Sequence, residues 1–209
     1  MSHTLRATNI GSMGRQLDPA AEETLITRAK GRDYESFSKI VDAYQGRIYG
    51  FVKRMIRDQE EALDVTQEVF IKAYQAFDRF DGRSSLRTWL FKIAHNLCID
   101  RARKHDRTPY EMHLDDHDGE SEAFQVPDSR WDPEAIALQS ELKGVIEAAL
   151  ASMSEKLRTV LLLQDVEDMP YEEISALLGV PVGTVKSRIF LARAHVKNYL
   201  DRYQAGVRG

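Results

Sequence analysis

Apolar residues recur at spacings of three and four along most of the chain, which is the pattern of one face of an α-helix. This pattern predicts four helices in the N-terminal half. Asp18, followed by a proline, opens the first helix, and Asp33 precedes the second. Asp58, with Glu61 three residues later, forms a capping-box pattern for the third. A break containing Gly82 leads to the fourth, and no segment shows the alternation of a β-strand.

The apolar stripes of these four helices predict a shared core. Its members are Leu25, Ile26, Ala29, Phe37, Ile40, Val41, Tyr44, Ile48, Phe51, Val52, Met55, Ala62, Leu63, Val69, Phe70, Ala73, Phe77, Leu86, Trp89, Leu90, Ile93, Ala94 and Leu97. Because Trp89 belongs to the fourth stripe, we expect its ring to lie in the core more than on the surface. Cys98, beside Leu97, is expected to be a small buried hydrophobe.

A second helical unit begins where Asp132-Pro133 repeats the cap-and-proline pattern. Its first helix is predicted to bury Ile136, Leu142, Val145, Ile146, Ala149 and Leu150, and the helix capped by Ser154 to bury Leu157, Val160, Leu161 and Gln164. A short helix from Pro170 to Leu178 and a long one from about Val182 to Tyr203 follow. The fold class is therefore all-α. We expect a disordered leader over residues 1–17, two small helical domains at 18–105 and 133–209, and a flexible acidic linker over 106–132.

Charge supports this division. The 209 residues carry a net charge of −4, but the stretch from His105 to Glu134 holds ten acidic residues and two basic ones. That stretch alone contributes −8, so the rest of the chain is +4 and mildly basic. A segment this acidic without an apolar stripe is predicted to be unstructured by itself.

The segment LLGVPVGTVKSRI, residues 177–189, has the pattern of a helix-turn-helix. Gly179 stands where a helix C-terminus favours the left-handed conformation that glycine adopts cheaply. The helix that follows is predicted to bury Val185, Ile189 and Ala192. Its exposed face is predicted to carry Thr184, Lys186, Ser187, Arg188 and Arg193, whose donors suit phosphates and guanine edges. The alternative is an ordinary solvated basic face.

No chemistry of catalysis or of metal binding is predicted. His105, His113 and His117 follow no standard zinc spacing, and no nucleophile–base order or phosphate loop is present, so we expect no cofactor, no small-molecule substrate and no enzyme activity. The single cysteine fits a reducing cytoplasm. The sequence contains no run of about 18 apolar residues, so no membrane span is predicted.

Two long segments resemble a known family. DVTQEVFIKAYQAFDRFDGRSSLRTWLFKIAHNLCIDRARK, residues 64–104, resembles the promoter-melting domain of the extracytoplasmic-function sigma factors of bacterial RNA polymerase. MPYEEISALLGVPVGTVKSRIFLARAHV, residues 169–196, resembles their last helix-turn-helix. The resemblance covers about residues 22–203, and two long motifs in the right order are more specific than either alone.

The resemblance implies a sigma factor that binds the clamp and flap regions of core RNA polymerase, directs it to promoters and promotes DNA melting. It places polymerase binding at Asp64, Gln67 and Glu68. It places binding of the −10 element, including a base held by the FDGRSS loop, at Phe80, Gly82, Arg83, Ser84, Ser85, Arg87, Lys92, Asn96, Asp100, Arg101 and Arg103. It places binding of the −35 element at Thr184, Lys186, Ser187, Arg188, Phe190 and Arg193. It also implies a cytoplasmic location and an anti-sigma factor. If that anti-sigma factor is anchored in the membrane, it would hold this protein there.

Two positions depart from the family pattern. Leu191 stands where relatives often carry a basic residue, so the preferred −35 sequence is not predicted. Pro170 replaces the usual serine or threonine before Tyr-Glu-Glu, with no expected structural consequence, because proline is tolerated in a first helical turn.

Two other classes of protein fit the pattern less fully. A stand-alone helix-turn-helix regulator would bind duplex DNA tightly without polymerase, through residues 134–209. A helical adaptor would bind only proteins, and the substitution Arg188→Ala would then leave its function intact.

Overall fold

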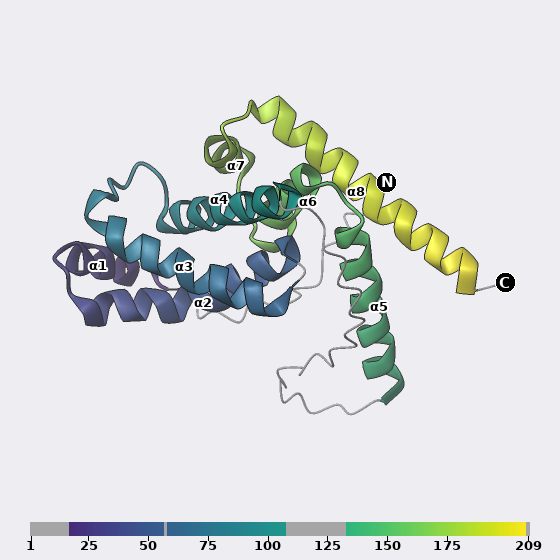
Figure 1. The fold of residues 1–209 in the computed structure, drawn as a ribbon, viewed down its shortest axis with the longest axis horizontal. Coiled ribbons are helices and arrows are strands. Elements are labelled where there is room, and N and C mark those ends of the chain that lie inside the picture. The colour runs from purple at the N-terminus through teal and green to yellow at the C-terminus, as the bar shows by residue number, and fades with distance from the viewer. Residues whose placement is uncertain (1–16, 57, 108–132, 208–209) are drawn as a thin grey trace.

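The computed structural model describes residues 17–56, 58–107 and 133–207, with side chains for 17–56, 58–104 and 141–206. All regular secondary structure in these residues is helical (Figure 1). The helices are α1 (Pro19–Lys30), α2 (Tyr34–Met55), α3 (Gln59–Ala76), the 3-10 turn η1 (Phe77–Arg79), α4 (Leu86–Arg107), α5 (Pro133–Ala151), α6 (Glu155–Leu161), the π-helical turn η2 (Leu162–Val166), α7 (Tyr171–Leu178) and α8 (Val182–Val207). The all-α prediction is confirmed. Residues 1–16 of the predicted leader and residues 108–132 of the predicted acidic linker lie outside the described residues.

Helices α1 to α4 form the first bundle, and their start signals act much as the sequence predicts. The Asp33 side chain accepts hydrogen bonds from the Glu35 amide at 3.2 Å and from Ser36 Oγ at 2.6 Å. Asp58 accepts from the Glu61 amide at 2.7 Å, which is the predicted cap. Asp18 makes no such side-chain bond. Its backbone carbonyl instead accepts a hydrogen bond from the Glu22 amide in the first turn of α1.

The core of the first bundle largely follows the predicted stripes, with several differences. Leu63 is 46% exposed, so its predicted burial is wrong. One residue rotates a helix by about 100°, and the buried face of α3 runs through Ala62, Val65 and Val69, which leaves Leu63 beside it. Phe91 is fully buried on α4 and packs edge to face on Phe51, although the predicted core did not include it.

Helices α5 to α8 form the second bundle, in which α8 packs against α5, α6 and α7. Val145, Ala149 and Leu150 of α5 are buried as predicted, but Leu142 is 48% exposed, so its predicted burial is wrong. The predicted helix after Ser154 is interrupted by the π-helical turn η2. This turn buries Leu162 and Leu163 and leaves Gln164 half-buried.

Arg158 joins the ends of several helices. It is 8% exposed, and its guanidinium donates to the carbonyls of Leu150 at 2.8 Å, Met153 at 2.9 Å and Ala151 at 3.2 Å. These carbonyls lie at and beyond the C-terminus of α5, where no further helical turn supplies donors. A fourth bond reaches the Met55 carbonyl at the end of α2, at 3.2 Å. One buried cation therefore satisfies carbonyls of both bundles.

The two bundles pack against each other, which the sequence pattern did not predict. Helix α7 lies against α4, and α5 and α6 contact α2 (Figure 1). The hydrophobic core consequently continues from one bundle into the other. The first helix of the predicted helix-turn-helix thus rests on the helix that carries most of the predicted −10 residues.

Candidate nucleic-acid interface

The turn between α7 and α8 has helix-turn-helix geometry. Gly179 ends α7 with φ 66° and ψ 34°, the predicted left-handed conformation. Its amide donates to the Ser175 carbonyl at 2.9 Å, and Ser175 Oγ donates to the Val180 carbonyl at 2.6 Å. The Ser175 hydroxyl therefore links the end of α7 to the turn. The two helix axes then bend by 105°.

Helix α8 presents one buried and one polar face. Val185, Ile189 and Ala192 are buried, as predicted. Of the predicted −35 residues, Lys186, Ser187, Phe190 and Arg193 are exposed, and Thr184 and Arg188 are half-buried. Phe190 is 73% exposed, and an apolar side chain this open on a cationic helix suits contact with a thymine methyl group.

Arg193 differs from the other predicted −35 residues because it is already paired. Its Nε lies 3.1 Å from Asp165 Oδ2, and its Nη2 donates to Oδ1 of the same carboxylate. This side-chain hydrogen bonding raises the pKa of Arg193 above its ordinary value. The pair ties α8 to the π-helical turn η2, so DNA binding by Arg193 requires it to exchange Asp165 for a phosphate.

Packing of buried aromatic rings supports the FDGRSS loop before α4. Phe80 is 4% exposed, and its ring lies 5.2 Å from that of Trp89 and 6.1 Å from that of Phe77. Trp89 is half-buried, as the core interpretation predicts. Phe80 therefore supports the loop, whose outer surface comes from Gly82, with φ 76°, and Arg83, 89% exposed and paired with Asp81 at 2.9 Å. Ser84 is half-buried and Ser85 exposed.

The predicted −10 residues of α4 fall on different faces. Lys92, Asn96, Asp100 and Arg103 are exposed and spaced by four, four and three residues, so they form one row along the helix. Arg101 lies apart from this row. Its guanidinium faces α3, at 3.6 Å from Glu61 and 3.3 Å from Glu68.

The predicted polymerase-binding residues lie on the outer face of α3. Asp64 and Gln67 are exposed. Glu68 is 34% exposed; burial raises its pKa, but hydrogen bonds from Lys72 and Arg101 outweigh this and hold the pKa below its ordinary value. Sequence reasoning missed the apolar part of this face, Leu63 and Ile71, which are 46% and 55% exposed.

At the contact between the bundles, Glu167 is the central residue. It is 6% exposed, accepts from Arg47 Nε at 2.8 Å and lies 2.6 Å from Arg47 Nη2. Its backbone carbonyl accepts from Arg87 at 3.1 Å. Burial raises the pKa of the Glu167 carboxyl, although Arg47 and Arg87 oppose the shift. Arg87, a predicted −10 residue, is therefore engaged by the second bundle.

Comparison with known proteins agrees with both halves of this geometry. The family Sigma-70 region 2 matches residues 40–108, and Sigma-70, region 4 matches residues 143–196. RNA polymerase sigma-H factor of Pseudomonas aeruginosa is 35% identical, over 86% of this chain and 94% of its own length. The ECF RNA polymerase sigma factor SigW of Bacillus subtilis is also 35% identical, over 84% and 94%.

The chain belongs to the extracytoplasmic-function sigma factors. It therefore directs promoter-specific initiation of transcription by RNA polymerase. Among solved structures, CnrH in complex with the cytosolic domain of CnrY matches 87% of this sigma factor with a TM-score of 0.62 at 22% identity, which shows the shared fold. The sigma factor RpoE of Bartonella quintana, in complex with the anti-sigma factor NepR, matches 80% with a TM-score of 0.61 at 25% identity.

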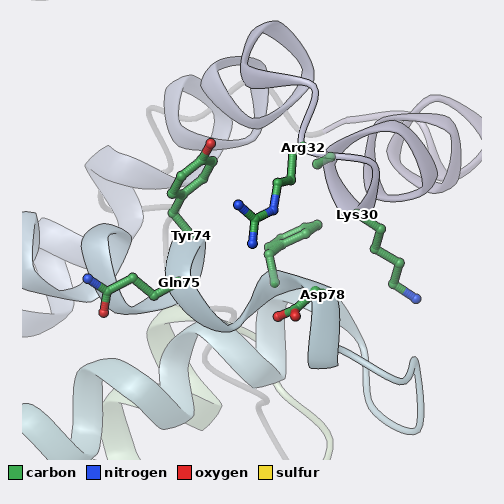
Figure 2. Close-up of a pocket in the computed structure, with 7 residues that line it drawn as sticks. Lys30, Arg32, Tyr74, Gln75 and Asp78 are labelled. Carbon is green, nitrogen blue, oxygen red and sulfur yellow. The ribbon is translucent and has the colours of Figure 1, made fainter.

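A small cavity of this sigma factor lies beside the FDGRSS loop. It has a volume of about 230 Å³ and is lined by Ala29, Lys30, Arg32, Tyr74, Gln75, Phe77 and Asp78. Figure 2 shows the Arg32 side chain reaching into it from the turn after α1. The Lys30 ammonium lies 5.5 Å from the centre of the Phe80 ring, so the cavity borders the loop. Its volume is below the roughly 300–1,000 Å³ of small-molecule sites.

Among the residues with described side chains, no group of His, Cys, Asp or Glu has the arrangement of a metal site, and His105, His113 and His117 lie outside that part of the chain. No single described helix is long and apolar enough to cross a membrane; only α7 and α8 taken together meet that measure, and they are bent by 105°.

Proposed function

We propose that the two bundles divide promoter recognition between them, with domain limits at 18–105 and 133–209. The first bundle binds core polymerase through the outer face of α3 and the −10 element through the FDGRSS loop and the exposed row of α4. The second bundle binds the −35 element through α8, and it also binds the polymerase flap. The observation that carries this assignment is the left-handed Gly179 turn, which sets α8 at 105° to α7 with its polar face exposed.

Chemistry on both faces supports the assignment. Lys92 and Arg103 on α4, and Lys186 on α8, are exposed cations suited to phosphates. Asn96 and Asp100, one turn apart in the α4 row, are exposed groups suited to base edges. The protein itself performs no catalysis and acts in the cytoplasm, where core polymerase carries out the chemistry.

An anti-sigma factor is the proposed regulator. RpoE of Bartonella quintana was solved in complex with the anti-sigma factor NepR, and CnrH in complex with the cytosolic domain of CnrY. The exposed Leu63 and Ile71 on the polymerase-binding face of α3 would be covered by such a protein, which would exclude polymerase. An anti-sigma factor anchored in a membrane would hold the sigma factor there.

Run-off transcription with core polymerase and a library of genomic fragments tests the proposed function. The full chain should produce start sites that core polymerase alone does not, preceded by a shared pair of elements. It should bind duplex DNA weakly without polymerase. Tight specific duplex binding by the isolated chain, with no new start sites, would instead identify a stand-alone regulator.

A further inference from the structure

A carboxylate of the second bundle sits on a cluster of donors at the start of α4. Glu173, in the first turn of α7, accepts hydrogen bonds from Ser85 Oγ at 3.3 Å and from Thr88 Oγ1. The same oxygen, Oε2, lies 3.7 Å from Arg87 Nη2. Thr88 is only 3% exposed, whereas Glu173 is 35% exposed. Three donors from one helix terminus thus converge on a single anion.

This set of donors is of the kind that proteins use for phosphate. Two hydroxyls and a guanidinium supply both hydrogen bonds and charge, and the N-terminus of a long helix adds a favourable dipole. Ser85 and Arg87 belong to the proposed −10 surface, but Thr88 was not predicted from the sequence. A carboxylate in this position satisfies the donors as a phosphate oxygen would.

The backbone around Glu167 holds α7 in this place. Residues 162–166 form a π-helical turn, and Asp168 adopts a left-handed φ of 53°. Both conformations are uncommon for such residues and cost free energy, so tertiary contacts must stabilise them. The Arg47–Glu167 ion pair and the bond from Arg87 to the Glu167 carbonyl supply such contacts directly between the two rare features.

The closed arrangement does not fit simultaneous binding of two promoter elements. Elements centred near −10 and −35 lie roughly 25 base pairs apart, or about 85 Å along B-form DNA. Here α7 packs directly on α4, so the two proposed DNA-binding faces belong to touching helices. The bundles must separate on a promoter, and separation removes Glu173 from Ser85, Arg87 and Thr88.

We propose that Ser85, Arg87 and Thr88 form a binding site for a backbone phosphate of promoter DNA, and that Glu173 occupies this site in the closed protein. DNA and α7 then compete for the same donors, which makes the free protein a weak DNA binder. The ligand identity rests on the proposed function, because the site adjoins the proposed −10 surface.

The test compares two substitutions on one helical turn. Glu173→Ala removes the seated carboxylate, and Glu172→Ala removes the same charge from an exposed neighbour. Binding of the full chain to a fluorescein-labelled, mixed-sequence single strand of about 20 nucleotides is measured by anisotropy over a range of salt concentrations. Small-angle scattering of the same variants reports whether the bundles separate.

Glu173→Ala should bind the strand about fivefold more tightly than Glu172→Ala, with a larger radius of gyration. The slope of log affinity against log salt should steepen by about 0.7, as one further phosphate contact requires. Adding Thr88→Val, which keeps the shape and removes one neutral donor, should reverse much of the gain in affinity, while the slope, which reports the charge of Arg87, should change little. Circular dichroism confirms that each variant is folded.

Equal affinity and slope for Glu173→Ala and Glu172→Ala would overturn the proposal, since any gain would then reflect net charge alone. A gain in affinity that Thr88→Val leaves undiminished would also overturn it, because the phosphate would then bind elsewhere. Run-off transcription by the unmodified chain tests the proposed function separately. If run-off transcription produced no new start sites but strand binding behaved as expected, the proposed function would be wrong and the anion site would still be supported.

Discussion

The Arg47 guanidinium and the Glu167 carboxylate lie 120 positions apart in the chain and meet at 2.6 Å between the two bundles. Their side chains are 15% and 6% exposed, so both ions have lost most of their water. Removing one ion of such a pair is costly because it leaves the other buried without a partner. The pair is therefore one of the contacts that hold the two bundles together.

A double-mutant cycle on this pair should show strong coupling. Arg47→Ala and Glu167→Ala should each destabilise the protein, and the double variant should lose less than the sum, with a coupling free energy of about 2 kcal/mol. Urea unfolding measures it. The exposed pair Lys39–Glu35, 2.8 Å apart and 57% and 79% exposed, is the control, with expected coupling of about 0.4 kcal/mol. Similar coupling for both pairs would show that the contact between bundles is weak.

Replacing Arg158 should be among the most damaging single changes to stability. Arg158→Met keeps the length of the side chain and removes every donor, which leaves the carbonyls of Leu150 and Met153 without the guanidinium. We expect a loss of about 3 kcal/mol in the free energy of unfolding. Arg202→Met, at an exposed site on α8, should cost less than about 0.5 kcal/mol. A loss at Arg158 no larger than at Arg202 would contradict the bridging role.

Two glycines of the helix-turn-helix should respond oppositely to alanine. Gly179 has φ 66°, so Gly179→Ala should destabilise by about 1–2 kcal/mol through backbone strain, although nothing blocks the added Cβ. Gly183 lies within α8, also in open space, and Gly183→Ala should stabilise by about 0.5–1 kcal/mol. Thermal unfolding of both variants provides the comparison. Equal effects would mean that the turn does not need its left-handed residue.

Only the N-terminal part of the polar face of α8 should contribute to transcription. Arg188→Ala should lower run-off transcript from a promoter of this sigma factor about tenfold, or about 1.4 kcal/mol, because a base or phosphate contact is lost. Lys197→Ala, a basic residue further along α8, should leave transcript within about twofold. Both variants should bind core polymerase equally in gel filtration. Undiminished transcript with Arg188→Ala would favour a helical adaptor.

Cys98 should make the folded protein less stable in alkali. Burial raises the pKa of its thiol from 9.0 to about 12, so between these values the folded state holds a proton that the unfolded state releases. Stability from this residue is complete below pH 9 and falls as pH rises toward 12. Cys98→Ser, which does not titrate there, should flatten the decline by up to about 1.4 kcal/mol per pH unit. Identical pH profiles would exclude the buried thiol as the cause.

Much of the candidate site was predictable because it depends on local rules. The left-handed Gly179, the Asp58 cap and the buried row of Val185, Ile189 and Ala192 follow from backbone sterics, hydrogen bonding and helical period. Leu63 was misplaced because a stripe read by spacing does not say which of two adjacent apolar residues faces a partner. Exposure of Leu63 became visible only once α3 was packed.

The sequence by itself determined an all-α chain, the helix starts, the turn of the helix-turn-helix and the family. Each of these depends on residues that are close together in the chain. Only the tertiary structure decided that α7 rests on α4, that Arg87 and Thr88 meet Glu173, and that Arg47 pairs with Glu167. The physical reason is that these partners lie 80 or more positions apart. Periodicity carries no information about which faces of distant helices will exclude water together.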